Sequence, residues 1–229
     1  MKIRNLEELQ NEIDNDIAWR KKEITDYYKI CQSSNYLGCL TRAGIVLVCS
    51  HFEGSIRFAS NAYIAFISSQ NIKGSDLRIE INAIAVRKKK HLLFNQTGSK
   101  KVKVSSVSEV LKSYDELLNG YFYFKIKEDD IVSEVNENDP ALPTEGNPTP
   151  EVLREIAKIL GLDYSSLFLL RERFINSELL NLRHCIAHGE RRPIKIQELD
   201  DAKNFVLRIM DDYSSAIIEA AMNNTHMKN

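Results

Sequence analysis

The sequence lacks the short motifs that mark several large enzyme classes. It contains no G-x-x-x-x-G-K-[ST] loop, no G-x-G-x-x-G turn, no H-E-x-x-H pair and no Cys/His set with zinc-ligand spacing. These absences argue against a P-loop NTPase, a dinucleotide-binding enzyme and the common zinc enzymes. The sequence therefore predicts neither a cofactor nor a bound metal ion.

Cysteine and long apolar runs are also scarce. The four cysteines, at positions 31, 39, 49 and 185, form no C-x-x-C pair, so we expect free, small side chains in a reducing compartment. The most apolar stretch, residues 43–67, is interrupted by His51, Glu53 and Arg57, and the acidic, amphipathic N-terminus has no signal-peptide core. We therefore predict a soluble cytoplasmic protein with no membrane partner.

Charge is nearly balanced overall but uneven along the chain. The formal net charge is -1, so affinity for a polyanion requires local clusters of Lys and Arg. Residues 87–103 carry seven Lys/Arg and no acid, whereas residues 128–139 carry six acids and no Lys/Arg. The first segment is either a solvated loop or a contact for RNA. The second is expected to be an exposed charge run, and its alternative is a cation site.

Apolar residues recur at helical spacing through most of the 229 residues. They predict helices over 6–31, 36–69, 150–160, 165–183 and 196–223, with Thr149 and Pro150 beginning the third and Gly161 ending it. Between the halves, residues 107–118 and 121–126 suggest a short helix and a strand, and residues 140–150 hold four of the five prolines. The fold class is thus an all-α bundle of four to five helices, forming a single domain over residues 1–229 with an irregular insertion at about 71–148.

One cluster of polar residues interrupts the apolar pattern near the end of the fourth predicted helix. Arg183 is followed by His184 and, five positions after the arginine, by His188, which lies between Ala187 and Gly189. An Arg and a His at this spacing arise by chance in roughly one chain in four of this composition, so the spacing alone is weak. The non-functional interpretation is a solvated helix end whose side chains cap backbone carbonyls.

The Arg-His-x-x-Ala-His-Gly motif at residues 183–189 resembles the HEPN superfamily of ribonucleases. The resemblance extends to residues 51–54, His-Phe-Glu-Gly on an apolar helix, which are similar to the MAE-type stand-alone prokaryotic group of HEPN proteins. It covers residues 36–70 and 150–222. It implies a HEPN-like helical fold, RNA cleavage and a setting in toxin or antiphage defence loci.

The side chains suit cleavage of RNA, whose 2'-hydroxyl supplies the nucleophile. Such a reaction needs a base, an acid and a cation that stabilises charge on the phosphorane. We assign His188 as general base or acid, Arg183 as phosphate clamp and His184 as an orienting or phosphate-contacting group. One Arg and one His per chain are too few for a complete site, so the interpretation calls for a homodimer with two facing copies.

Other residues receive supporting assignments. Glu53 and Arg57 share one helix face and are predicted to hold Arg183, or else they form only a structural ion pair. His51 is expected to be a satisfied residue in or at the edge of the core. Lysines and arginines in two segments are predicted to bind the RNA backbone, namely Lys88, Lys89, Lys90, Lys100, Lys101, Lys103, Arg191 and Arg192.

The leading hypothesis is a metal-independent endoribonuclease that leaves a 2',3'-cyclic phosphate and acts as a toxin or defence effector. Its partners would be RNA, a second copy of the chain and an antitoxin or another defence-system protein. The alternative is a non-catalytic, HEPN-like dimeric module that binds RNA, a nucleotide or a partner protein.

Overall fold

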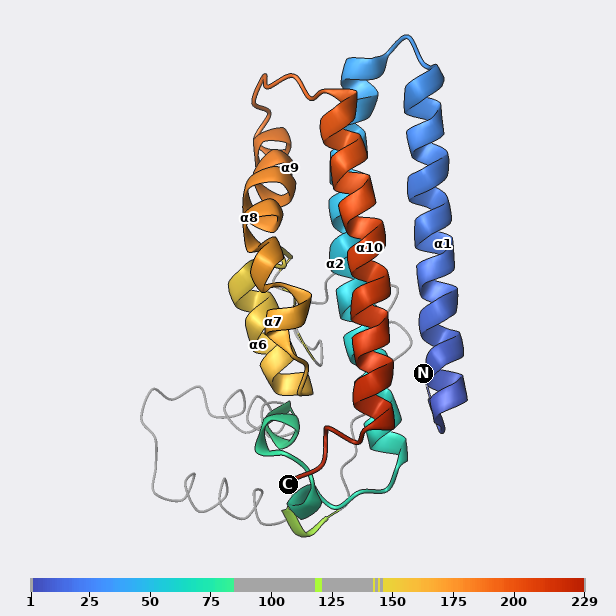
Figure 1. Ribbon diagram of the computed structural model, residues 1–229, viewed down its shortest axis with the longest axis vertical. Helices are drawn as coiled ribbons and strands as arrows, with labels where there is room; N and C mark the ends of the chain where they lie inside the picture. The colour runs from blue at the N-terminus through green and yellow to red at the C-terminus, as the bar shows by residue number, and fades with distance from the viewer. Residues whose placement is uncertain (1, 85–117, 121–141, 143, 145, 229) are drawn as a thin grey trace, which may run out of the picture.

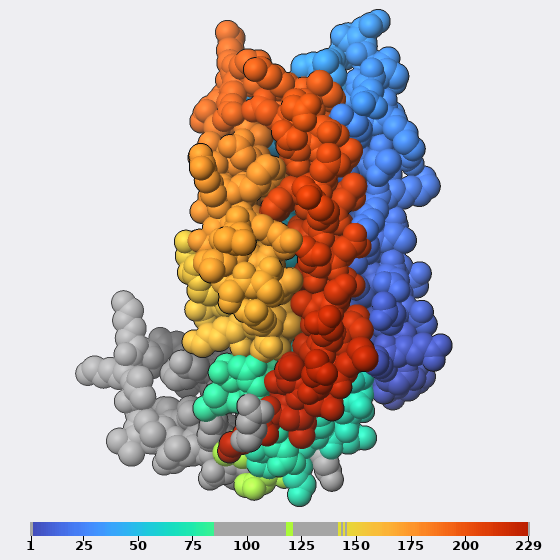
Figure 2. Space-filling model, in the orientation of Figure 1, coloured from blue at the N-terminus to red at the C-terminus, as the bar shows by residue number. Residues whose placement is uncertain are grey.

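Three long helices form the frame of the fold. They are α1 (Leu6–Ser33), α2 (Leu37–Ser69) and α10 (Ile196–Met222) in the computed structural model, which describes residues 2–84, 118–120, 142, 144 and 146–228. Buried side chains occur along almost the whole length of α2, as expected for a helix that is apolar around most of its circumference. The space-filling view shows α10 and its neighbours covering the middle of α2 (Figure 2). α2 is therefore the central helix, as its sequence predicts.

A fourth column consists of short helical segments. They are α6 (Pro150–Leu160), α7 (Tyr164–Leu167), the 3-10 turn η2 (Leu169–Arg171), α8 (Glu172–Phe174), the π-helical turn η3 (Ile175–Leu180) and α9 (Asn181–Ala187). α6 begins and ends as predicted. The Thr149 side chain accepts a hydrogen bond from the Val152 N–H, and Gly161 ends the helix with a φ of 74°.

The prediction of one continuous helix over residues 165–183 is wrong. The chain leaves α-helical geometry at Phe168 and passes through η2, α8 and η3 before α9 begins. The break leaves Leu170 95% exposed, although a continuous helix would put it on the apolar face.

The π-helical turn η3 leaves no trace in the apolar pattern. The fully buried Ile175 and Leu179 are four positions apart, a spacing that an α-helix also gives. The turn differs in its hydrogen bonds, which span five residues. It sets the direction of the side chains that follow on α9.

The four columns alternate in direction (Figure 1). The connection between α1 and α2 and the loop between α9 and α10 therefore lie at the same end. Two hydrogen bonds join α2 to that loop: Thr41 Oγ1 donates to the Ile194 carbonyl at 3.0 Å, and Arg42 Nη1 donates to the Arg192 carbonyl at 2.8 Å. The all-α fold is confirmed for the described residues, which hold no strand.

Part of the predicted insertion packs into this bundle. Leu77, Ile81 and Leu142 are buried in the common hydrophobic core, and Leu77 pairs with Met227 in an isolated β-bridge. The predicted strand at 121–126 and nearly all of the predicted helix at 107–118 lie outside the described residues. The single-domain assignment stays a prediction.

Candidate active site

The α9 segment ends in a Schellman motif built by the Ala-His-Gly sequence. The Glu190 N–H donates to the Cys185 carbonyl and the Gly189 N–H donates to the Ile186 carbonyl, each at 3.0 Å. Gly189 has a φ of 73°, which a residue with a side chain rarely adopts. The glycine is therefore explained by the backbone at the helix end, and His188 occupies the capping position in front of it.

Arg183 is half-buried and turns toward the segment that precedes α6. Its Nη1 donates to the Gly146 carbonyl at 2.8 Å and to Asn147 Oδ1 at 2.9 Å. Both bonds come from one nitrogen of the guanidinium group, which has five N–H donors in all. The guanidinium is thereby anchored at one edge.

Glu53 on α2 contacts the same segment from the other side. Its Oε1 accepts a hydrogen bond from Thr144 Oγ1 at 2.8 Å. Glu53 and Arg183 thus each contact this segment, at Thr144 and at Gly146 and Asn147 respectively, whereas the sequence-based hypothesis has Glu53 bonding Arg183 directly. Arg57, one turn further along α2, is half-buried and has no hydrogen-bond partner among the described residues. The supporting roles of Glu53 and Arg57 stay predictions.

Cys49 lies close enough to Arg183 and Glu53 for both charges to act on its thiol. Burial raises the pKa of its thiol to about 12, the positive charge of Arg183 opposes this rise, and the negative charge of Glu53 adds to it. The thiol stays protonated at neutral pH, so it is no nucleophile. Its Sγ lies 3.5 Å from the Leu179 carbonyl, and Cys49 thus serves as a packing contact between α2 and η3.

His184 and His188 lie together on the exposed side of α9. Their ring centroids are 4.1 Å apart and the ring planes meet at 53°. The two residues are four positions apart, which places them about 40° apart around the helix, whereas Arg183 and His188 are about 140° apart. Within one chain the structure brings His188 to His184, and it directs Arg183 to a different face.

The remaining predicted site residues divide into two groups. Arg191 is exposed, while Arg192 donates from Nη2 to Glu198 Oε1 at 2.9 Å. The six lysines of the basic stretch, Lys88, Lys89, Lys90, Lys100, Lys101 and Lys103, lie outside the described residues. Their predicted contact with RNA stays a prediction.

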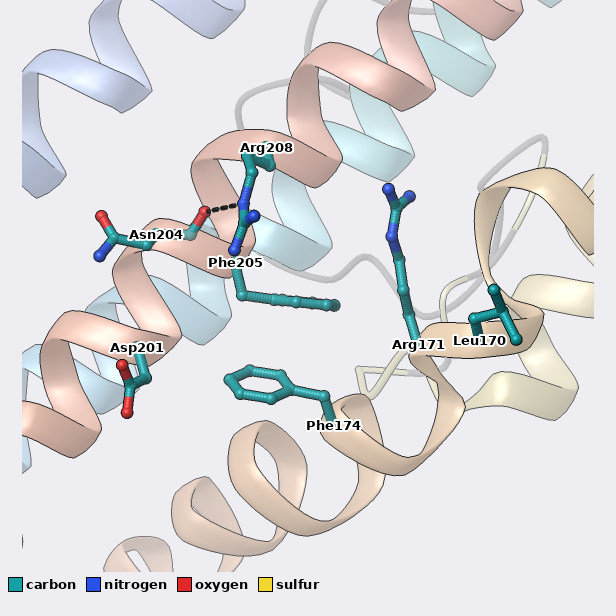
Figure 3. Close-up of a pocket in the computed structure, with 7 residues that line it drawn as sticks. All are labelled: Leu170, Arg171, Phe174, Asp201, Asn204, Phe205 and Arg208. Carbon is teal, nitrogen blue, oxygen red and sulfur yellow. Dashed lines mark hydrogen bonds between the residues drawn. The ribbon is translucent and has the colours of Figure 1, made fainter.

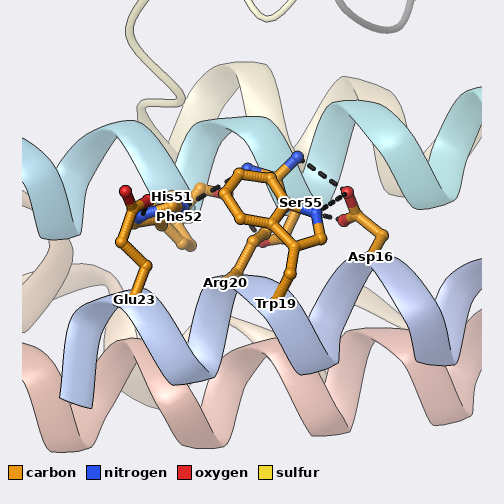
Figure 4. A network of polar contacts seen from close by, with 7 residues as sticks. All are labelled: Asp16, Trp19, Arg20, Glu23, His51, Phe52 and Ser55. Carbon is orange, nitrogen blue, oxygen red and sulfur yellow. Dashed lines mark hydrogen bonds and ion pairs between the residues drawn. The ribbon is translucent and has the colours of Figure 1, made fainter. Parts of the chain in front are cut away.

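The His-Phe-Glu-Gly segment of α2 faces two ways. Glu53 points to residues 144–147, whereas His51 and Gly54 face α1, where Arg20 and Asp16 form a buried ion pair at 2.7 Å (Figure 4). His51 Nε2 lies 2.8 Å from Glu23 Oε2, the distance of an ion pair. His51 is thus buried between helices, as the sequence analysis expects, and takes no part in the candidate site.

A separate pocket lies between α8 and α10 (Figure 3). Its floor is the stacked pair Phe174 and Phe205, whose centroids are 4.5 Å apart, and Arg171 and Arg208 flank it. None of the lining residues belongs to the predicted site. No motif in the sequence singles out either phenylalanine, so this pocket was not predicted.

Two general features of the described part of the chain bear on the class of site. No group of three or more His, Cys, Asp or Glu side chains there is arranged to hold a metal ion. No described helix combines the length and hydropathy that crossing a membrane requires.

Comparison with known proteins supplies the family. A search of curated proteins and a search of solved structures each return no match. A family model described as RiboL-PSP-HEPN matches residues 15–219, well over half of the chain. The match includes α2 and α9, the two helices that carry Glu53 and Arg183, and it confirms the predicted HEPN superfamily, while the MAE-type group stays a prediction. The chain therefore belongs to the RiboL-PSP-HEPN family.

Proposed function

We propose that this protein is a metal-independent endoribonuclease that cleaves single-stranded RNA and leaves a 2',3'-cyclic phosphate. The proposal rests on the residues at the end of α9, in a chain that belongs to a HEPN family. Two exposed imidazoles lie in contact there, directly after an arginine that is anchored by a single guanidinium nitrogen.

Each group has a role in the proposed reaction. The ring of His188 takes the proton of the 2'-hydroxyl or protonates the leaving 5'-oxygen. Arg183 stabilises the phosphorane, because a guanidinium group stays charged and matches two phosphate oxygens. His184, in contact with His188, orients that ring or binds the phosphate.

A homodimer completes the site in this proposal. Arg183 and His188 point about 140° apart on α9, so one chain does not aim both at the same phosphate. A two-fold interface that opposes two copies of α9 would supply two arginines and four imidazoles to one cleft.

The biological role extends the proposal by resemblance. HEPN ribonucleases of defence loci imply a toxin or antiphage effector, controlled by an antitoxin or another partner protein. The second candidate is a non-catalytic module that binds RNA or a protein. The stacked phenylalanines flanked by arginines between α8 and α10 favour this candidate, because such a surface suits a nucleobase and its phosphate.

The deciding experiment incubates the purified chain with RNA in EDTA, beside His188→Ala and Arg183→Ala. We expect each variant to cleave at least ~100-fold more slowly, the usual effect of losing a general base or a transition-state donor. Arg4→Ala, an exposed arginine at the other end of the bundle, is the matched control for a contaminating nuclease and should cleave normally.

An oligonucleotide with one 2'-deoxy residue at the cleavage position tests the nucleophile. It should resist cleavage at that position only, and mass spectrometry should find a cyclic phosphate on the all-ribose product. Wild-type rates in His188→Ala would remove this site from the mechanism. Binding without cleavage would favour the second candidate.

A further inference from the structure

The contact between His184 and His188 brings two potential metal-binding side chains together. Both residues are exposed, and no ring nitrogen of either has a hydrogen-bond partner among the described residues. The backbone beneath them is fixed, because the His188 N–H donates to the His184 carbonyl at 3.0 Å and the Schellman motif closes the helix beyond. Two nitrogen ligands are thus held four positions apart on one helix face.

This is the arrangement in which two histidines hold one transition-metal ion. Histidines at i and i+4 on a helix bind zinc from one face in metalloproteases. Metal–nitrogen bonds are about 2.0–2.1 Å long, so two ligand nitrogens on one ion lie close together. Rings whose centroids are already 4.1 Å apart need only small side-chain rotations to reach that geometry.

We propose that His184 and His188 chelate a divalent transition-metal ion of the zinc, nickel or copper class, through one ring nitrogen each. Water molecules, or the same pair on a second copy of the chain, complete the coordination. Among the described residues, no carboxylate or carbonyl accepts a hydrogen bond from the second ring nitrogen of either histidine. Such partners strengthen metal binding about 10–100-fold. The site therefore binds the ion reversibly and does not hold a permanent structural metal.

The consequence for activity rests on the proposed function. A nitrogen lone pair that is bound to a metal cannot accept a proton, so the ion would block the acid–base role of His188. The bound metal is then an inhibitor of a reaction that itself needs none.

Calorimetric titration of the full, untagged chain with zinc chloride tests the binding. We expect wild type to bind one ion per chain, or one per two chains if copies share it. His184→Ala and His188→Ala should each bind at least about 10-fold more weakly. Arg183→Ala is the matched control: it removes the neighbouring charged group but keeps both imidazoles, and it should bind zinc like wild type.

Thermal unfolding supplies a second readout that needs no ribonuclease activity. Zinc should raise the unfolding temperature of wild type and Arg183→Ala, because an ion that binds the folded state stabilises it. It should raise that of the two histidine variants much less, and magnesium should have no effect on any of them, since imidazole is a poor magnesium ligand. Undiminished zinc binding in the double variant His184→Ala/His188→Ala would overturn the proposal.

Cleavage assays separate this inference from the proposed function. If the protein cleaves RNA, zinc should slow wild type reversibly, and the residual cleavage by His184→Ala should not depend on zinc. If no cleavage is found, the proposed function fails, while the titration and the unfolding shifts still decide the metal site. Zinc binding at these residues with unimpaired cleavage would overturn the inhibitory role.

Discussion

At the scale of single residues, two hydrogen bonds hold the guanidinium group of Arg183 in position. Its Nη1 makes both described hydrogen bonds, one to a backbone carbonyl and one to the Asn147 side chain. A catalytic group held in place before substrate arrives loses less entropy when it reacts. The Asn147 amide is therefore a positioning group for the proposed phosphate clamp.

Replacing Asn147 by Ala should lower the rate at saturating RNA by about 10-fold, the scale expected for losing one hydrogen bond to a charged group. The effect should fall mainly on kcat, because substrate still meets the same guanidinium. Steady-state cleavage of a defined oligonucleotide measures it. Asn176→Ala, an exposed asparagine on η3, is the control, and equal rates in both variants would remove the anchoring role.

His51 links the stability of the fold to pH. Its pKa lies below the ordinary 6.5, because burial and the positive charge of Arg20 disfavour the protonated ring, while Glu23 and Asp16 oppose this shift only in part. The ring lies edge-on to Trp19, with centroids 5.2 Å apart (Figure 4). Folding therefore favours the neutral imidazole.

Acidification should destabilise the protein through this residue. The unfolded chain protonates His51 as the pH falls through about 6.5, whereas the folded chain does so only at lower pH, so this contribution is complete above 6.5 and declines below it. Urea unfolding at pH 7.5 and 5.5 should show a smaller loss of stability in His51→Gln than in wild type. Equal losses would assign the pH dependence elsewhere, for instance to the buried His226, whose pKa is lowered by burial in the same direction.

At the scale of elements, a buried ion pair on α1 packs against α2 at Gly54. The Arg20 and Asp16 side chains are only 10% and 7% exposed and make two hydrogen bonds, at 2.7 and 2.9 Å. Gly54 on α2 leaves the space for the guanidinium group, since a Cβ there would clash with Arg20 Nη1 and lie 3.0 Å from Cζ. The observed position of the Arg20 side chain thus depends on the lack of a side chain at Gly54.

Gly54→Ala should lower the free energy of unfolding by about 1–3 kcal/mol, the usual cost of overpacking. Gly38→Ala is a matched control on the same helix, because a Cβ at Gly38 meets no atom within 4 Å. It should be neutral or stabilise by up to about 1 kcal/mol, since alanine favours a helix over glycine. Equal denaturation midpoints for the two variants would show that Arg20 moves aside without cost.

At the scale of the whole molecule, the proposed mechanism requires a site that two chains share. Co-refolding His188→Ala chains with Arg183→Ala chains should restore part of the cleavage that each lacks alone, if the two chains contribute different groups to one cleft. Light scattering on the same samples should report a dimer. Refolding each variant alone is the control, and a monomer with full activity would contradict the shared site.

The sequence by itself determined the helices and their ends, because these are local properties. Helical spacing of apolar residues located α1, α2 and α10, and Thr149, Pro150 and Gly161 set the limits of α6. The same local logic did not resolve residues 165–183. The fully buried Ile175 and Leu179 keep a spacing of four that an α-helix also gives, so periodicity does not reveal the π-helical turn.

Only the tertiary structure decided what the polar side chains contact. Glu53 reaches Thr144 across 91 positions of sequence, and Arg183 reaches Gly146 across 37; no pattern along the chain specifies which of several nearby acceptors such side chains meet. The sequence predicted a contact of Glu53 with Arg183 but not the contacts that these two make with Thr144, Gly146 and Asn147. It also did not show that the rings of His184 and His188 meet. Local propensities fix helices, whereas contacts between columns depend on how those columns pack in three dimensions.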